Sequence, residues 1–239
     1  MKSQRSTHIV LEHDAVDLAE VGSIDASKTN DGYLLRLKDV SFYQDHDLLE
    51  IKQNLFFKKV RSDAYLAQIE LLDHAFFHLN HHDVVLFASD NSICNVNDLN
   101  CYANIISSWN KGRTLDWRKL SRQQRKIWLD ACSDWQWITQ RHIHSDLIVD
   151  CREIIDISSL YCCLGEVFFG EKGYIGRNLD AFDDCLLDLQ HAHRTIIFQN
   201  SHQLFTVLNT PKNKALYQDD YVSILIEIFN KHGFFTQLL

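Results

Sequence analysis

The sequence predicts an α/β fold for the C-terminal part of the chain, a three-stranded parallel sheet with helices, preceded by a mixed α+β N-terminal domain. The 239 residues exceed the length of a typical single domain. Apolar residues make up 46% and charged residues 23% of the chain, as in ordinary globular proteins. From Leu147 onward, short apolar runs alternate with amphipathic segments, which is the pattern of a parallel sheet covered by helices.

The first part of the chain mixes strand and helix patterns. Three short apolar or alternating runs, bounded by Asp, Asn or Gly, predict the strands His8–Leu11, Tyr33–Leu37 and Val84–Ala88. The segment Ser62–Leu79 has apolar residues at three-to-four spacing, which predicts an amphipathic helix. These residues are Leu66, Ile69, Leu72, Phe76 and Leu79.

A second helix is predicted over Ser121–Trp137. Ser121 and Gln124 have the spacing of a capping box, in which each side chain bonds the other residue's backbone N–H. Ile127, Trp128, Ala131 and Trp135 supply its buried face. The periodicity ends around Gln140–Ser145, so we expect an N-terminal domain of residues 1–140 and a second domain of residues 141–239.

The second domain contains enough predicted elements for one small sheet. The predicted strands are Leu147–Asp150, Thr195–Gln199 and Phe234–Leu239. The predicted helices are Ser158–Phe168, Asn178–Gln190, a short one after Ser201, and Asp219–Lys231. Strands that alternate with helices favour a parallel arrangement.

The charge distribution excludes some partners. The formal net charge is −8, and from Arg141 onward thirteen acidic residues stand against eight basic ones. Direct binding to nucleic acid normally needs a basic face, so we do not expect it. A basic protein is the natural partner of an acidic domain.

The sequence also indicates a compartment. The polar start Met1–His8 is not followed by an apolar core, so no secretory signal is expected, and no segment approaches the roughly 18 apolar residues of a membrane span. The seven cysteines include no Cys-x-x-Cys pair, and an odd number argues against a disulfide framework. We therefore expect reduced thiols, a cytoplasmic location and no membrane partner.

One predicted helix carries an unusual acidic face. Asn178 is a favourable N-cap residue, and Asp180, Asp183 and Asp184 follow at i, i+3 and i+4 positions of one face. Like charges at this spacing repel by a few tenths of a kcal/mol per pair. An ordinary solvated helix face is one explanation, and a binding surface for cations is the other.

The residues around this helix resemble the barstar family. The family motif is a Tyr, then Gly-x-Asn-Leu-Asp-Ala, then Asp-Cys-Leu, and it is matched without a gap by Tyr174, Gly176, Asn178, Leu179, Asp180, Ala181, Asp184, Cys185 and Leu186. Upstream, the segment Leu147–Leu160 is similar to the family's opening strand, turn and entry to its first helix. The resemblance extends from about His142 to Leu239.

The resemblance implies a protein inhibitor of a basic ribonuclease, of the immunity type that neutralises a toxin, and neither an enzyme nor a cofactor protein. It implies that Asp184 enters the nuclease active site, with Asp180 beside it and Tyr174 as an aromatic anchor. Carboxylates on a preformed helix can occupy phosphate positions through charge-assisted hydrogen bonds. The implied binding residues are Tyr174, Gly176, Asn178, Leu179, Asp180, Ala181, Asp183, Asp184 and Glu227.

Two positions depart from the family pattern. Asp183 stands where the best-known member has an aromatic residue, and Ile175 replaces a second tyrosine. These changes imply a different cognate nuclease. The family has a further acid on the last long helix, and Glu227 is the candidate for it here. The alignment of this helix with the family leaves the position open by one residue.

Two other groups of residues suggest different functions for the N-terminal domain. His74 and His78, at i and i+4 in a cluster with His81 and His82, could share a metal, although a solvated polar helix face explains them better and no metal site is expected. Five tryptophans among basic residues could bind nucleic acid, although helical spacing favours a core role for two of them, Trp128 and Trp135. The alternative function is therefore an N-terminal enzyme or a metal- or nucleic-acid-binding module, with the C-terminal domain as a docking unit.

Overall fold

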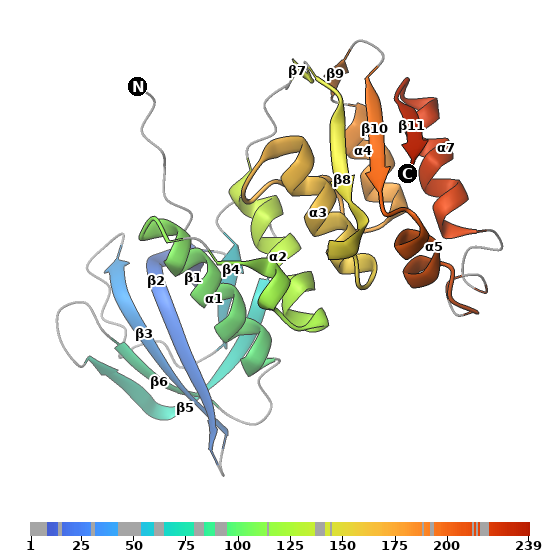
Figure 1. Cartoon of the computed structure of the whole chain (residues 1–239). Helices are drawn as coiled ribbons and strands as arrows, with labels where there is room; N and C mark the ends of the chain where they lie inside the picture. Colours follow the sequence, from blue (N-terminus) through green and yellow to red (C-terminus); the bar gives the residue numbers. More distant parts are fainter. Residues whose placement is uncertain are drawn as a thin grey trace. The chain divides into compact units, whose positions relative to one another are not determined.

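The computed structural model of the chain contains two compact units, Met1–Leu115 and Asp116–Leu239 (Figure 1). The predicted division at residues 140 and 141 falls within residues 137–141, which lie outside the described residues, and the units divide some way before it. The structure describes residues 9–13, 16–29, 32–42, 54–59, 65–78, 84–88, 95–113, 115–136, 142–143, 145–187, 189–191, 194–211, 213, 215 and 220–239.

The first unit is a closed antiparallel barrel of six strands in the order β1-β2-β3-β6-β5-β4, with β4 pairing back to β1. The strands are β1 (Ile9–His13), β2 (Val16–Thr29), β3 (Gly32–Phe42), β4 (Asn54–Lys59), β5 (Tyr65–His78) and β6 (Val84–Ala88). Along β3, Leu35 and Leu37 are buried while Arg36 and Lys38 are exposed. This alternation follows from the two-residue repeat of a strand with one face in a core.

A helix completes this unit. Helix α1 (Val96–Asn110) begins after Asn95, whose side chain accepts a hydrogen bond from the Asp98 N–H. The side chain of Asn100 bonds both the N–H and the carbonyl of Ala26 in β2, each at 2.7 Å. These two bonds join the helix to the backbone of the strand.

Three predicted strands of this unit are confirmed, since His8–Leu11 corresponds to β1, Tyr33–Leu37 lies in β3, and Val84–Ala88 is β6. The helix predicted over Ser62–Leu79 is wrong, because Tyr65–His78 is strand β5, paired with β4 and β6. The apolar residues of this segment also fit a two-residue repeat, since alternate positions from Tyr65 to Phe77 are apolar or aromatic except Asp73. Pairing with distant strands decided between the two periods.

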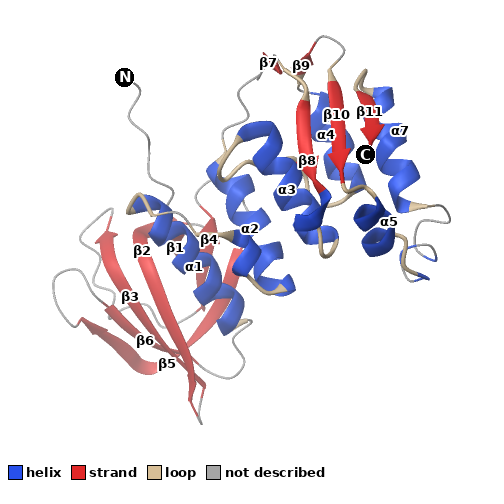
Figure 2. Ribbon diagram, in the orientation of Figure 1, coloured by secondary structure: helices blue, strands red, loops and turns tan. Residues whose placement is uncertain are grey.

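The second unit contains a three-stranded parallel sheet of order β11-β10-β8, as predicted (Figure 2). Val149, Ile196 and Phe198 are fully buried on one face, while Ile148 on the opposite face is 54% exposed. The elements are β8 (Leu147–Asp150), the 3-10 turn η3 (Cys151–Glu153), α3 (Ile157–Phe169), α4 (Leu179–Leu187), β10 (Thr195–Gln199), α5 (His202–Leu208), α7 (Tyr221–Lys231) and β11 (Phe235–Leu238). Every strand and helix predicted here is confirmed, with bounds that differ by at most a few residues.

Aromatic side chains form the core between the sheet and its helices. The ring of Phe229 in α7 lies 5.0 Å from that of Phe182 in α4 and 5.9 Å from that of Phe198 in β10, centroid to centroid, both edge to face. The buried hydroxyls of Tyr161 and Tyr221 share a hydrogen bond of 2.7 Å. Edge-to-face ring pairs add to the burial of apolar area, so this core holds α4 firmly.

Helix α2 (Arg122–Trp135) belongs to the second unit and packs against α3. Its predicted capping box is confirmed: Ser121 Oγ accepts from the Gln124 N–H, and the Gln124 side chain accepts from the Ser121 N–H. A 3-10 turn, η2 (Trp117–Lys119), precedes it. A small parallel pair, β7 (His142–Ile143) with β9 (Gln190–His191), was not predicted.

Among the described helices, none is both long and apolar enough to cross a membrane. The six cysteines within the described residues are free thiols. Four of them, Cys132, Cys151, Cys162 and Cys163, are buried.

Candidate functional site

The loop before α4 is shaped by close contacts between backbone segments. A Cβ atom built on Gly165 of α3 would lie 2.2 Å from the carbonyl oxygen of Gly173, and one built on Gly173 would lie 2.0 Å from the carbonyl oxygen of Gly165. Real Cβ atoms do not approach so closely, so both positions require glycine. The loop therefore lies directly on α3.

Gly176 and Asn178 then set the start of α4. Gly176 has a φ of +100°, and a Cβ there would lie 2.6 Å from the backbone nitrogen of Phe182. The side chain of Asn178 accepts a hydrogen bond of 2.8 Å from the Ala181 N–H, so it caps the helix as predicted. The Gly-x-Asn part of the motif thus folds the loop against the first turn of the helix.

Helix α4 has one buried and one exposed side. Leu179, Phe182 and Leu186 are buried, and Asp180 and Asp184 are exposed. Within the part of the chain that the structure describes, neither of these two aspartate side chains has a hydrogen bond or an ion pair. Two carboxylates one turn apart are therefore available to a partner.

Asp183 is engaged within the molecule. Its carboxylate accepts hydrogen bonds from Lys231 Nζ at 2.7 Å and lies 2.6 Å from His232 Nε2, both at the end of α7. The hydrogen bonds from Lys231 and then from His232 hold the pKa of Asp183 below its usual value. This acid ties α4 to α7, and its charge is compensated there.

Glu227 is exposed on α7, four residues before Lys231. Residues four apart are neighbours on one helix face, so Glu227 shares a face of α7 with the lysine that contacts α4.

The other predicted binding residues differ in exposure. Tyr174 is half-buried, and burial raises the pKa of its hydroxyl. Ala181 is half-buried, while Gly176 and Leu179 are buried, so the structure places these last two beneath the surface that Asp180 and Asp184 occupy. Ile175, which replaces a family tyrosine, is fully buried.

Sequence reasoning missed the contacts that α2 makes with this loop. Asp130 forms an ion pair of 2.7 Å with Arg177, and the Gln136 side chain accepts a hydrogen bond from the Tyr174 N–H. The ammonium of Lys172 lies 4.6 Å from the centre of the Trp135 ring. The first two contacts join positions 47 and 38 residues apart, and no local pattern could have indicated them.

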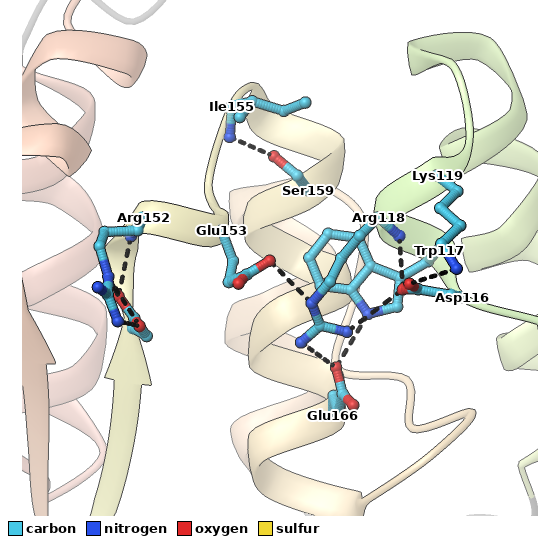
Figure 3. A network of polar contacts seen from close by, with 10 residues as sticks. Asp116, Trp117, Arg118, Lys119, Arg152, Glu153, Ile155, Ser159 and Glu166 are labelled. Atoms are coloured by element: carbon cyan, nitrogen blue, oxygen red, sulfur yellow. Dashed lines mark hydrogen bonds and ion pairs between the residues drawn. The ribbon is translucent and has the colours of Figure 1, made fainter.

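Of the described tryptophans in the rival nucleic-acid surface, three are buried and Trp135 is half-buried. Trp109, Trp117 and Trp128 are buried, and Trp117 Nε1 donates to Glu166 at 2.9 Å (Figure 3). Arg118 forms ion pairs with Glu153 at 2.8 Å and Glu166 at 3.0 Å. Base stacking needs exposed rings and free cations, which this network does not offer.

The side chains of the histidine cluster considered for metal binding lie outside what the structure describes. The side chains of His74 and His78, and all of His81 and His82, lie outside the described residues. The described residues contain no group of three or more His, Cys, Asp or Glu side chains that could hold a metal ion.

Comparison with known proteins finds one family match, which lies within the second unit. Residues 144–231 match the family model of Barstar, described as barnase inhibitor. Neither the curated proteins nor the solved structures contained a match to the chain. The family match covers α4 and the loop before it.

Proposed function

Because residues 144–231 match the barstar family model, we propose that this protein inhibits a basic ribonuclease by placing Asp180 and Asp184 of α4 in its active site. The observation that carries the proposal is the pair of exposed carboxylates, without partners among the described residues, on one face of a helix. Gly176 and Asn178 preform that helix before any partner binds.

The chemistry of a ribonuclease site suits this arrangement. Such a site holds a phosphodiester with lysine, arginine and histidine side chains, and carboxylates can replace the phosphate oxygens through charge-assisted hydrogen bonds. A helix that is already folded loses little conformational entropy on binding. Asp184 would enter the catalytic pocket with Asp180 beside it, while Tyr174 and Glu227 would contact the enzyme around them.

The protein would act as an immunity protein that neutralises a nuclease toxin in the cytoplasm, where free thiols persist. The pairing of Asp183 and the burial of Ile175 support a cognate nuclease other than barnase, because neither position offers an aromatic contact. The acidic balance of the chain would speed association with a basic enzyme.

The test is inhibition of a panel of basic microbial ribonucleases, barnase included, by the full chain and by its variants. Asp184→Ala and Asp180→Ala would each leave active-site cations unpaired, a cost of about 2 to 5 kcal/mol, so dissociation should be faster by roughly 30-fold to several thousandfold. Stopped-flow or surface-binding kinetics would measure these rates. Asp25→Ala is the control, since Asp25 is an exposed acid on β2 of the first unit.

The control variant should dissociate at the parent rate, and all variants should unfold at nearly the parent temperature because the residues are exposed. If Asp184→Ala inhibits as tightly as the parent while folded, α4 is not the inhibitory surface. If the parent protein inhibits none of the ribonucleases in the panel, the proposed function itself is contradicted.

A further inference from the structure

Helix α2 lies before the matched residues 144–231, yet it is part of the same compact unit and contacts the loop that carries Tyr174 and Arg177. The contacts come from the C-terminal half of α2 and from its C-cap. Asp130 pairs with Arg177, and the Gln136 side chain accepts a hydrogen bond from the Tyr174 N–H.

Helix α2 is itself firmly anchored at other positions. Arg125 is 5% exposed and forms an ion pair of 2.6 Å with Asp156 at the N-terminus of α3. Trp128, Leu129 and Cys132 are buried. The side chains that anchor α2 are therefore different from those that contact the loop, and α2 can serve as a fixed support.

We infer that α2 is a positioning element of the inhibitory surface: it holds the loop Gly173–Asn178, and thereby Tyr174 and the first turn of α4, in the binding conformation. This inference rests on the proposed function. A loop that is already held loses less conformational entropy when the partner binds, so the complex should dissociate more slowly.

The Asp130–Arg177 ion pair has a second effect. Arg177 is the basic residue inside the Tyr174–Leu186 motif, and it lies three residues before Asp180. Without Asp130, its guanidinium could pair with Asp180 or repel the cations of the nuclease. Asp130 therefore keeps this cation on the α2 side of the loop and leaves Asp180 available.

The first measurement needs no nuclease. In the full-length protein, amide hydrogen exchange by NMR should show the Tyr174 N–H exchanging several-fold faster in Gln136→Ala than in the parent, since its acceptor is removed. Gln136→Glu keeps an acceptor oxygen and should restore slow exchange. Asp130→Asn should speed exchange across residues 173–178, and Arg122→Gln, at an exposed site in the first turn of α2, should not.

The second measurement uses a ribonuclease that the chain inhibits in the panel assay. Asp130→Asn and Gln136→Ala should each speed dissociation about threefold to tenfold, much less than Asp184→Ala. A double-mutant cycle with Arg177→Ala should show coupling between positions 130 and 177. The melting temperature should stay near that of the parent, because Arg125, Trp128 and Leu129 still anchor the helix.

The outcomes separate the two proposals. Parent-like exchange and parent-like dissociation in Asp130→Asn and Gln136→Ala, with Asp184→Ala still impaired, would overturn the role of α2 and leave the proposed function intact. Faster exchange with unchanged dissociation would show that α2 holds the loop without contributing to inhibition, which also overturns the inference. If no ribonuclease is inhibited, the proposed function fails, and the contribution of α2 to inhibition falls with it.

Discussion

Gly176 shows how one backbone conformation determines which side of a helix is exposed. Its φ of +100° lies in the region that L-residues rarely adopt, and its Cα faces the backbone of Ala181 and Phe182 without room for a side chain. The turn at Gly176 brings Asn178 to the cap position of α4. The exposure of Asp180 and Asp184 follows from this start, because it determines which side of α4 faces the core.

Gly176→Ala is expected to lower the free energy of unfolding by more than Gly170→Ala. Both glycines have positive φ, so each substitution carries a conformational cost on the order of 1 kcal/mol or more. A Cβ at Gly170 meets open space, whereas one at Gly176 meets backbone atoms at 2.6 Å that must move. Urea unfolding of the two variants would measure the difference, and equal losses would show that the close approach at Gly176 is not rigid.

At the scale of elements, the contact between α2 and α3 is centred on a buried charge. Asp156 caps α3 by accepting from the Ser159 N–H at 2.8 Å, and it also pairs with Arg125 of α2. Burial alone would raise the pKa of Asp156, but the hydrogen bonds from Arg125 and from Ser159 outweigh burial and lower it. Nearby, Trp117 and Arg118 bond Glu166 of α3, which adds a second attachment (Figure 3).

Asp156→Asn is expected to destabilise the protein by about 3 kcal/mol at pH 7, since it leaves the buried guanidinium of Arg125 without its counter-ion. A lowered folded-state pKa means that the charged form stabilises the fold above the unfolded-state value of about 3.9. This contribution is lost as pH falls through the folded-state pKa. Denaturant unfolding at several pH values should therefore show that the difference in free energy of unfolding between parent and variant becomes smaller in acid.

Asp180→Asn is the matched control for this series. Asp180 is exposed and has no partner within the described residues, so its stability change should stay within about 0.5 kcal/mol at every pH. If the difference in free energy of unfolding between parent and Asp156→Asn does not change with pH, the Asp156 charge does not stabilise the contact of α2 with α3.

At the scale of the whole molecule, the second unit begins before the family match. Residues 116–136 are joined to the part of the chain after Leu147 by the contacts Trp117–Glu166, Arg118–Glu166, Arg125–Asp156 and Asp130–Arg177. The first unit is a separate barrel with its own core. The second unit therefore has the contacts of an independent domain that includes α2.

A fragment of residues 116–239 is expected to unfold cooperatively and with higher stability than a fragment of residues 141–239. The shorter fragment keeps the three strands and α3, α4 and α7, but it loses the helix that covers α3 and the counter-ion of Asp156. Circular dichroism during urea unfolding would compare them. Equal midpoints would show that α2 adds no stability and that a division near residue 140 describes the domain as well.

The sequence by itself determined the second unit's strand and helix order, its parallel sheet, the two helix caps and the acidic face of α4. These features depend on apolar periodicity and on contacts within one turn, for example Ser121 with Gln124 or Asn178 with Ala181. Such signals are local, so they can be read in one stretch of chain.

Only the tertiary structure decided that Tyr65–His78 is a strand, that Asp183 pairs with the end of α7, and that α2 contacts the loop before α4. Each of these rests on residues far apart in sequence. The apolar pattern of β5 fits both a helix and a strand, and pairing with β4 and β6 chose the strand. The local sequence around an aspartate on a helix face is the same whether or not a distant lysine pairs with it. The packing of the elements decides which charges become partners.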